Sequence, residues 1–166
     1  MATRLQIAKS DIVVAFAQGR HVLRTTEIAH LLSENRQHWR LAQSTSLHDF
    51  ISFMVDKTDL RRVRFPFPQR EVLGYTWGRV PMLETLLHLV DRSYYSHYTA
   101  VRIHGLTEQI PKTVYLSREK HRGESSRREV PPLYPQEKVD EAFQRLPRMS
   151  SNQVELEEEG IRVMLL

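Results

Sequence analysis

The 166-residue sequence contains no cysteine, so disulfide bonds and thiolate chemistry are excluded, and a reducing compartment is compatible with the composition. It also lacks any apolar run near the roughly 18 residues needed to cross a bilayer. Polar residues at 6 and 9–11 interrupt the N-terminal segment, so it lacks the continuous apolar stretch of a secretory leader. The six glycines are scattered and form no phosphate-binding loop. We therefore expect a cytoplasmic protein.

The charged residues are unevenly distributed along the chain. Residues 1–70 hold 11 Lys and Arg against 6 Asp and Glu, and residues 112–128 hold 6 against 2. Residues 151–166 reverse the balance, with 1 basic against 4 acidic residues. A basic N-terminal region favours a polyanionic partner such as nucleic acid, and the alternative is a merely solvated basic surface. The segment Lys112–Arg128 offers the same two readings, a second polyanion surface or a charged loop.

Three helices are predicted in the N-terminal region. The first spans Ser10–Gln18 and ends at Gly19, and a short strand follows at Val22–Arg24. Thr25 and Thr26 precede the second helix, whose apolar positions follow helical spacing. After a polar segment, Ser33–Ser44, Ser46 caps a third helix from Leu47 to about Lys57. Its predicted inward residues are Leu47, Phe50, Ile51, Met54 and Val55.

A β-hairpin is predicted next, with strands Leu60–Phe65 and Val72–Trp77 joined by a turn at Pro66–Arg70. Three helices followed by a hairpin are typical of a winged helix-turn-helix domain, which we predict over residues 1–79. Any other small α+β domain is the competing interpretation.

Residues 80–166 are predicted to form a second α+β domain. It would open with a helix after Pro81, continue through the segment Tyr94–Ser117, and include a long charged loop, Ser117–Pro135. A short helix at Gln136–Arg145 and a strand at Ile161–Leu166 would complete it. Because the chain ends on an apolar strand, we expect it to be a fragment of a longer protein, with this domain incomplete.

The predicted hairpin and third helix supply candidate DNA contacts. Guanidinium groups on a wing add sequence-independent attraction to phosphates, although charge on an edge strand also prevents aggregation. Readout of bases would use polar side chains at the start of the third helix and in the segment before it. Trp39 is interpreted as a packing anchor. The predicted DNA-binding residues are Arg36, His38, Arg40, Ser44, Ser46, His48, Arg61, Arg62, Arg64, Gln69 and Arg70.

Two other function classes were weighed against DNA binding. Asp49 and Asp56 on the third helix favour a protein-interaction module that uses the same fold without DNA. An enzyme is disfavoured, because no carboxylate pair or nucleophile has an evident partner, and the acidic run Glu155–Glu159 is read as a solvated turn. His97 and His104 are seven residues apart with no third ligand nearby, so no metal, cofactor or catalytic residue is predicted.

The segment Tyr94–Ser117 has the most distinctive wording in the chain. Ser96 is a predicted helix cap, Tyr98, Val101 and Leu106 are predicted apolar anchors, and Gly105 is a predicted left-handed stop before a strand. This wording, Ser-His-Tyr-x-Ala-x-x-x-His-Gly-Leu-Thr-x-Gln-x-Pro, resembles the AbiEi family of type IV antitoxins.

The resemblance implies a two-part regulator in a phage-defence (abortive infection) system. Its winged-helix domain would bind inverted repeats in the operator of its own operon and repress transcription. Its C-terminal domain would counteract a nucleotidyltransferase-like toxin without forming a stable complex with it. Most of the matching residues are expected to be structural: Ser96, His97, Tyr98, Ala100, His104, Gly105, Leu106, Gln109 and Pro111.

Overall fold

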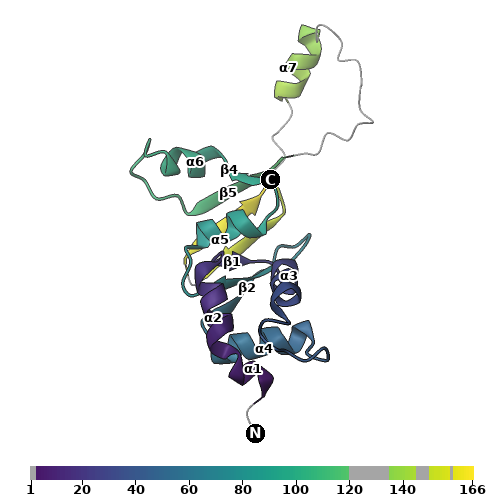
Figure 1. Cartoon of the computed structure of the whole chain (residues 1–166). Coiled ribbons are helices and arrows are strands. Elements are labelled where there is room, and N and C mark those ends of the chain that lie inside the picture. The colour runs from purple at the N-terminus through teal and green to yellow at the C-terminus, as the bar shows by residue number, and fades with distance from the viewer. Residues whose placement is uncertain (1–2, 120–134, 145–149, 158) are drawn as a thin grey trace. The chain divides into compact units, whose positions relative to one another are not determined.

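The computed structural model describes residues 3–119, 135–144, 150–157 and 159–166 as a mixed α+β protein with two sheets (Figure 1). The α+β class predicted from the sequence is confirmed. The chain divides into two compact units, Met1–Asp91 and Arg92–Leu166. The sequence had placed the boundary after residue 79, and the packing of the helix that follows accounts for the later division.

The first unit contains four helices before its hairpin. Their order is α1 (Arg4–Ile7), α2 (Lys9–Gln18), β1 (Val22–Leu23), α3 (Thr25–Asn35) and α4 (Leu47–Lys57). Helix α1 was not predicted, although the hydrogen bonds that cap it join residues only three positions apart. Thr3 N–H donates to Gln6 Oε1 at 2.8 Å, and Gln6 N–H donates back to Thr3 Oγ1 at 3.4 Å. Helix α3 corresponds to the second predicted helix and extends to Asn35. The connection to α4 is therefore residues 36–46, whereas the predicted polar segment was Ser33–Ser44.

The core of the first unit is an aromatic-rich cluster beneath α2, α3 and α4. Phe50 of α4 lies at its centre, fully buried, with its ring 6.3 Å from Phe16 and 5.9 Å from Trp39. The burial of Phe50, Ile51 and Met54 confirms the predicted inward face of α4. Val55 was also predicted to face inward, and this was wrong: its side chain is exposed, because the core ends at the other flank of the helix.

The three-stranded sheet of the first unit has helices on both faces. Strands β2 (Leu60–Phe65) and β3 (Val72–Trp77) pair antiparallel as predicted, and β1 joins β3 to give the order β1-β3-β2. One face carries Tyr75 and Leu23 into the aromatic cluster. The other carries Gly74, against which α5 (Met82–Leu89) packs so closely that a Cβ there would lie 2.2 Å from Leu89 Cδ2. Because α5 covers this sheet, it belongs to the first unit.

The second unit is built on a four-stranded sheet with the order β4-β5-β7-β6. Strands β5 and β7 run parallel, and the other two pairings are antiparallel. The helix predicted at Gln136–Arg145 and the strand predicted at Ile161–Leu166 are present as α7 and β7. Strands β4 and β6 were not predicted. Strand β6 includes the first residues of the acidic run Glu155–Glu159, which had been interpreted as a turn. The elements are β4 (Ser93–Tyr95), α6 (His97–Ile103), β5 (Thr113–Arg118), α7 (Gln136–Gln144), β6 (Gln153–Leu156) and β7 (Ile161–Leu165).

The segment Tyr94–Ser117 has the predicted order of elements but different anchors. Gly105 ends α6 with a left-handed φ of 69°, as expected. Tyr98 and Leu106, predicted to be anchors, are 37% and 75% exposed. Instead the short helix is tied down by buried Thr99, whose Oγ1 accepts a hydrogen bond from Tyr115 N–H at 2.8 Å.

Two sequence expectations concern the rest of the chain. Most of the predicted charged loop, residues 120–134, lies outside the described residues. No helix in the described ranges is long and apolar enough to cross a membrane.

Candidate nucleic-acid interface

The N-terminal end of α4 is organised around its own cap. Ser46 Oγ accepts a hydrogen bond from Asp49 N–H at 3.1 Å and donates one to Asp49 Oδ2 at 2.7 Å. The bond from the Ser46 side chain is the main cause that lowers the pKa of Asp49 below 3.8. His48 points outward, with Nδ1 3.8 Å from Asp49 Oδ1, and Ser44 is exposed nearby. Of the predicted residues here, Ser46 is therefore engaged in capping, and His48 and Ser44 face solvent.

Arg36 braces the connection between α3 and α4. Its guanidinium donates to the carbonyl oxygens of Ala42, at 2.6 Å, and Thr45, at 3.1 Å. These bonds close residues 36–45 into a compact loop directly before the cap of α4. In the structure two of the five N–H donors of Arg36 are thus bonded to the backbone, and the DNA contact of Arg36 stays a prediction.

Trp39 fixes the same connection to the core. Its side chain is buried and its ring stacks on Phe50 of α4, which confirms the interpretation as a packing anchor. Arg40 then adopts a left-handed φ of 51°, in a turn where its N–H donates to Gln37 O at 3.0 Å. With Trp39 turned inward, the flanking side chains of His38 and Arg40 are exposed.

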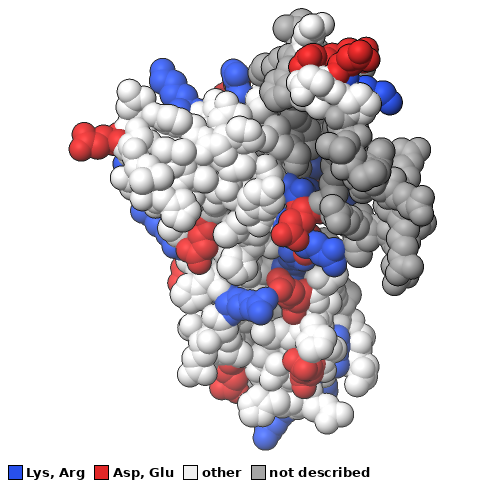
Figure 2. Space-filling model, turned by 90° about the horizontal axis from the view of Figure 1, so that it is seen from above, with Lys and Arg blue, Asp and Glu red and all other residues white. Residues whose placement is uncertain are grey.

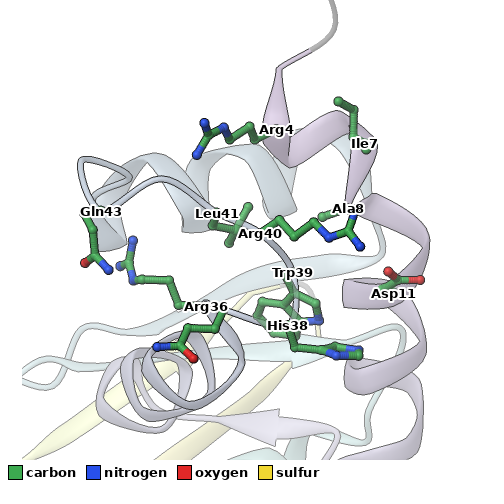
Figure 3. A pocket seen from close by; sticks show the side chains of 11 residues that line it. Arg4, Ile7, Ala8, Asp11, Arg36, His38, Trp39, Arg40, Leu41 and Gln43 are labelled. Carbon is green, nitrogen blue, oxygen red and sulfur yellow. The ribbon is translucent and has the colours of Figure 1, made fainter.

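A groove with a volume of about 850 Å³ lies between this connection and the first two helices (Figure 3). We call it the linker groove; it is lined by residues of α1, α2 and the α3–α4 connection. In Figure 3, Arg4 of α1 overhangs it, Arg40 extends across it, and Asp11 stands on the α2 side. Arg4 was not among the predicted residues. The Thr3–Gln6 capping pattern signals the start of α1, but it does not indicate that Arg4 lies at the groove.

The hairpin presents its arginines on two faces of the sheet. Arg62 and Arg64 lie opposite Tyr75 and Leu73 on the face that carries the aromatic cluster, and Arg61 lies on the face toward α5, as the strand alternation predicted. Arg64 and Arg62 differ in their interaction partners. Arg64 pairs with Glu71, whereas the Arg62 guanidinium lies 5.9 Å from the centre of the Tyr75 ring. Gln69 and Arg70 are exposed in the turn.

Ion pairing separates the basic side chains of the first unit into two groups. In the first group, Arg20, Arg24 and Arg64 each form an ion pair with an acidic residue. Figure 2 shows one face of the molecule, on which basic and acidic side chains are interspersed. The second group consists of basic side chains without an ion-pair partner within the described ranges. It includes Arg4, His38 and Arg40 at the linker groove, and Arg61, Arg62 and Arg70 on the hairpin. Five of these six were predicted DNA-binding residues.

The two histidines considered as metal ligands are not brought into a site. His97 Nδ1 lies 2.9 Å from Ser96 Oγ, and its ring packs against Tyr115. Across the residues that the structure describes, no group of three or more His, Asp or Glu side chains is arranged to hold a metal ion.

No family model matches the chain, and neither a curated protein nor a solved structure does.

Proposed function

We propose that the first unit is a winged helix-turn-helix domain that binds double-stranded DNA, and that the chain is a transcriptional repressor of the antitoxin type. The observation that carries the proposal is the order α2, β1, α3, α4, β2, β3 together with the sheet order β1-β3-β2. In such a domain α3 and α4 form the helix-turn-helix, α4 enters the major groove, and the β2–β3 hairpin is the wing.

The distribution of unpaired cations supports an assignment of roles. Arg61, Arg62 and Arg70 on the hairpin would contact phosphates, because no acidic side chain in the described part of the chain neutralises their charge. His48 and Ser44 are exposed at the start of α4 and would approach base edges. Arg36 and Ser46 act indirectly by positioning α4, since both are already hydrogen-bonded.

The regulatory part of the proposal rests on the resemblance of Tyr94–Ser117 to the AbiEi antitoxins. On that basis the operator would be an inverted repeat upstream of the chain's own operon, and the protein would act in the cytoplasm. The second unit would counteract a nucleotidyltransferase-like toxin without forming a stable complex with it. A two-fold symmetric operator would be read by two copies of the chain.

A salt titration of DNA binding tests the proposal. We expect the double variant Arg62→Gln/Arg70→Gln to bind any duplex more weakly and to lower the salt slope by about one to two, because each lost phosphate contact removes roughly one. The charge-matched control is Arg20→Gln/Arg79→Gln, which changes two arginines outside the hairpin and the linker groove. Equal effects of the two double variants on affinity and slope would rule out the hairpin contact.

The exposed face of α4 favours a second candidate function, protein binding. It carries Asp49, whose carboxylate disfavours phosphates nearby, the Asp56–Lys57 ion pair and the exposed apolar side chain of Val55. A winged helix can use this surface to bind a protein without contacting DNA. Elution of the purified protein from heparin and from immobilised duplex at low salt would favour this candidate over DNA binding.

A further inference from the structure

We propose that the linker groove contacts backbone phosphates of the DNA duplex, at a position separate from the contacts of α4 and the hairpin. The inference rests on the proposed DNA binding of the first unit. It adds a third contact, centred on Arg4 and Arg40, which come from segments far apart in the sequence and line one hollow (Figure 3).

The basic side chains of the groove are available for a ligand. In the described part of the chain, Arg4, His38 and Arg40 have exposed side chains without an ion-pair partner. Arg36, on the same connection, provides the contrast, because its guanidinium is held by two carbonyl groups. An unpaired guanidinium gives up no protein partner when it binds a phosphate oxygen, and it releases a counterion from the DNA.

The groove is rigidly connected to α4. Its floor includes the buried residues Trp39 and Leu41, and the Trp39 ring stacks on Phe50 with an angle of 11° between the planes. Arg40 is held by its left-handed turn, and Leu41 N–H donates to Arg36 O at 3.0 Å. A phosphate bound at Arg40 would therefore fix where α4 lies along the duplex. This is the register function that backbone contacts perform.

The composition of the groove favours a nucleic-acid backbone over an acidic protein. Its free cations are spread around an open hollow, which suits separate phosphate groups. Asp11 of α2 also lines the groove, toward the end where the Arg40 side chain extends, and its carboxylate disfavours an anion in its immediate surroundings (Figure 3). The exposed apolar side chain of Ile7 at the rim favours a protein partner instead, because a phosphate backbone offers no apolar group for it to pack against. Binding of an acidic protein there is thus the outcome that competes with the proposal.

The test compares Arg4→Gln/Arg40→Asn with the charge-matched control Arg20→Gln/Arg79→Gln. Asparagine is used at position 40 because it tolerates the left-handed backbone. We expect the groove variant to weaken binding to a short mixed-sequence duplex on the order of tenfold and to lower the salt slope by about two. Arg40→Lys should retain most of the affinity. Ethylation-interference footprints of the wild-type chain should show phosphates that no longer matter in the groove variant.

The outcomes distinguish this inference from the proposed function. If the wild-type chain binds duplex DNA and Arg62→Gln/Arg70→Gln weakens it, but the groove variant behaves like its control, the groove contact is refuted and DNA binding stands. If the wild-type chain shows no salt-dependent binding, both proposals fail. If the groove variant loses binding to a polyglutamate peptide and not to DNA, the groove is a protein site. Circular dichroism of each variant establishes that it is folded.

Discussion

The two units of the chain are held together in different ways. The first buries a large aromatic cluster, in which Phe16, Trp39 and Phe50 have their rings in contact. Among its described residues the second has fewer buried apolar side chains, and hydroxyl groups satisfy backbone groups in it, such as Thr99 at Tyr115 and Ser150 at Leu165. Side-chain hydrogen bonds contribute less to stability than the burial of large rings does. We infer that the large core lets the first unit carry unpaired basic side chains on its surface without losing its fold.

The largest expected effect is on the aromatic cluster. We expect Phe50→Ala to lower the free energy of unfolding of the first unit by about 3–5 kcal/mol, because it leaves a cavity and removes the stacking partner of Trp39. Both tryptophans, Trp39 and Trp77, lie in this unit, so their fluorescence in a urea titration reports on it alone. Phe53→Ala, at a half-buried position on the same helix, is the control and should cost less. A similar cost for both would remove Phe50 from the centre of the core.

The second effect concerns the hydroxyl-based packing of the second unit. We expect Thr99→Val to destabilise this unit by about 1–3 kcal/mol, because it leaves the Tyr115 N–H without its acceptor at similar side-chain volume. Hydrogen exchange of the Tyr115 amide should accelerate, and Thr99→Ser should restore protection. The tryptophan-monitored transition should not move. A shift of that transition would contradict the division into two units.

The smallest effect is at the cap of α4. We expect Ser46→Ala to cost about 1 kcal/mol and to raise the pKa of Asp49 toward 3.8, because the hydroxyl that stabilises the carboxylate is lost. Since the folded-state pKa is lowered, the carboxylate's contribution is present above pH 3.8 and is lost as the pH falls through that lowered value. The difference between wild type and variant should therefore shrink in acid. Carbon NMR of the Asp49 carboxyl group measures the titration, and an unchanged pKa would argue against the cap.

Local sequence signals predicted part of the fold and part of the candidate site. The helix from Ser46 to Lys57 and the Leu60–Trp77 hairpin were predicted with correct bounds, because caps, apolar spacing and turn residues are read within a few positions. The packing of α5 on Gly74 was not predictable, since it depends on contact between distant segments.

The same limit applied to the candidate site. The arginines could be named from the sequence, but their partners could not. Arg64 of the hairpin forms an ion pair with Glu71, and Arg36 of the α3–α4 connection donates hydrogen bonds to backbone carbonyls. Arg4 joins Arg40 at the linker groove only through tertiary structure. The misplaced anchors of α6 have a similar cause, because a seven-residue helix held by Thr99 does not follow an apolar pattern.

The parallel pairing of β5 with β7 has a consequence for synthesis of the protein on the ribosome. Strand β7 lies between β5 and β6, so the second sheet cannot be completed until residues 161–165 have left the exit tunnel. All strands of the first sheet lie before residue 78, and α5 ends at Leu89. The first unit can therefore fold while the rest of the chain is still being translated. A nascent chain would acquire its candidate DNA-binding surface well before its second sheet.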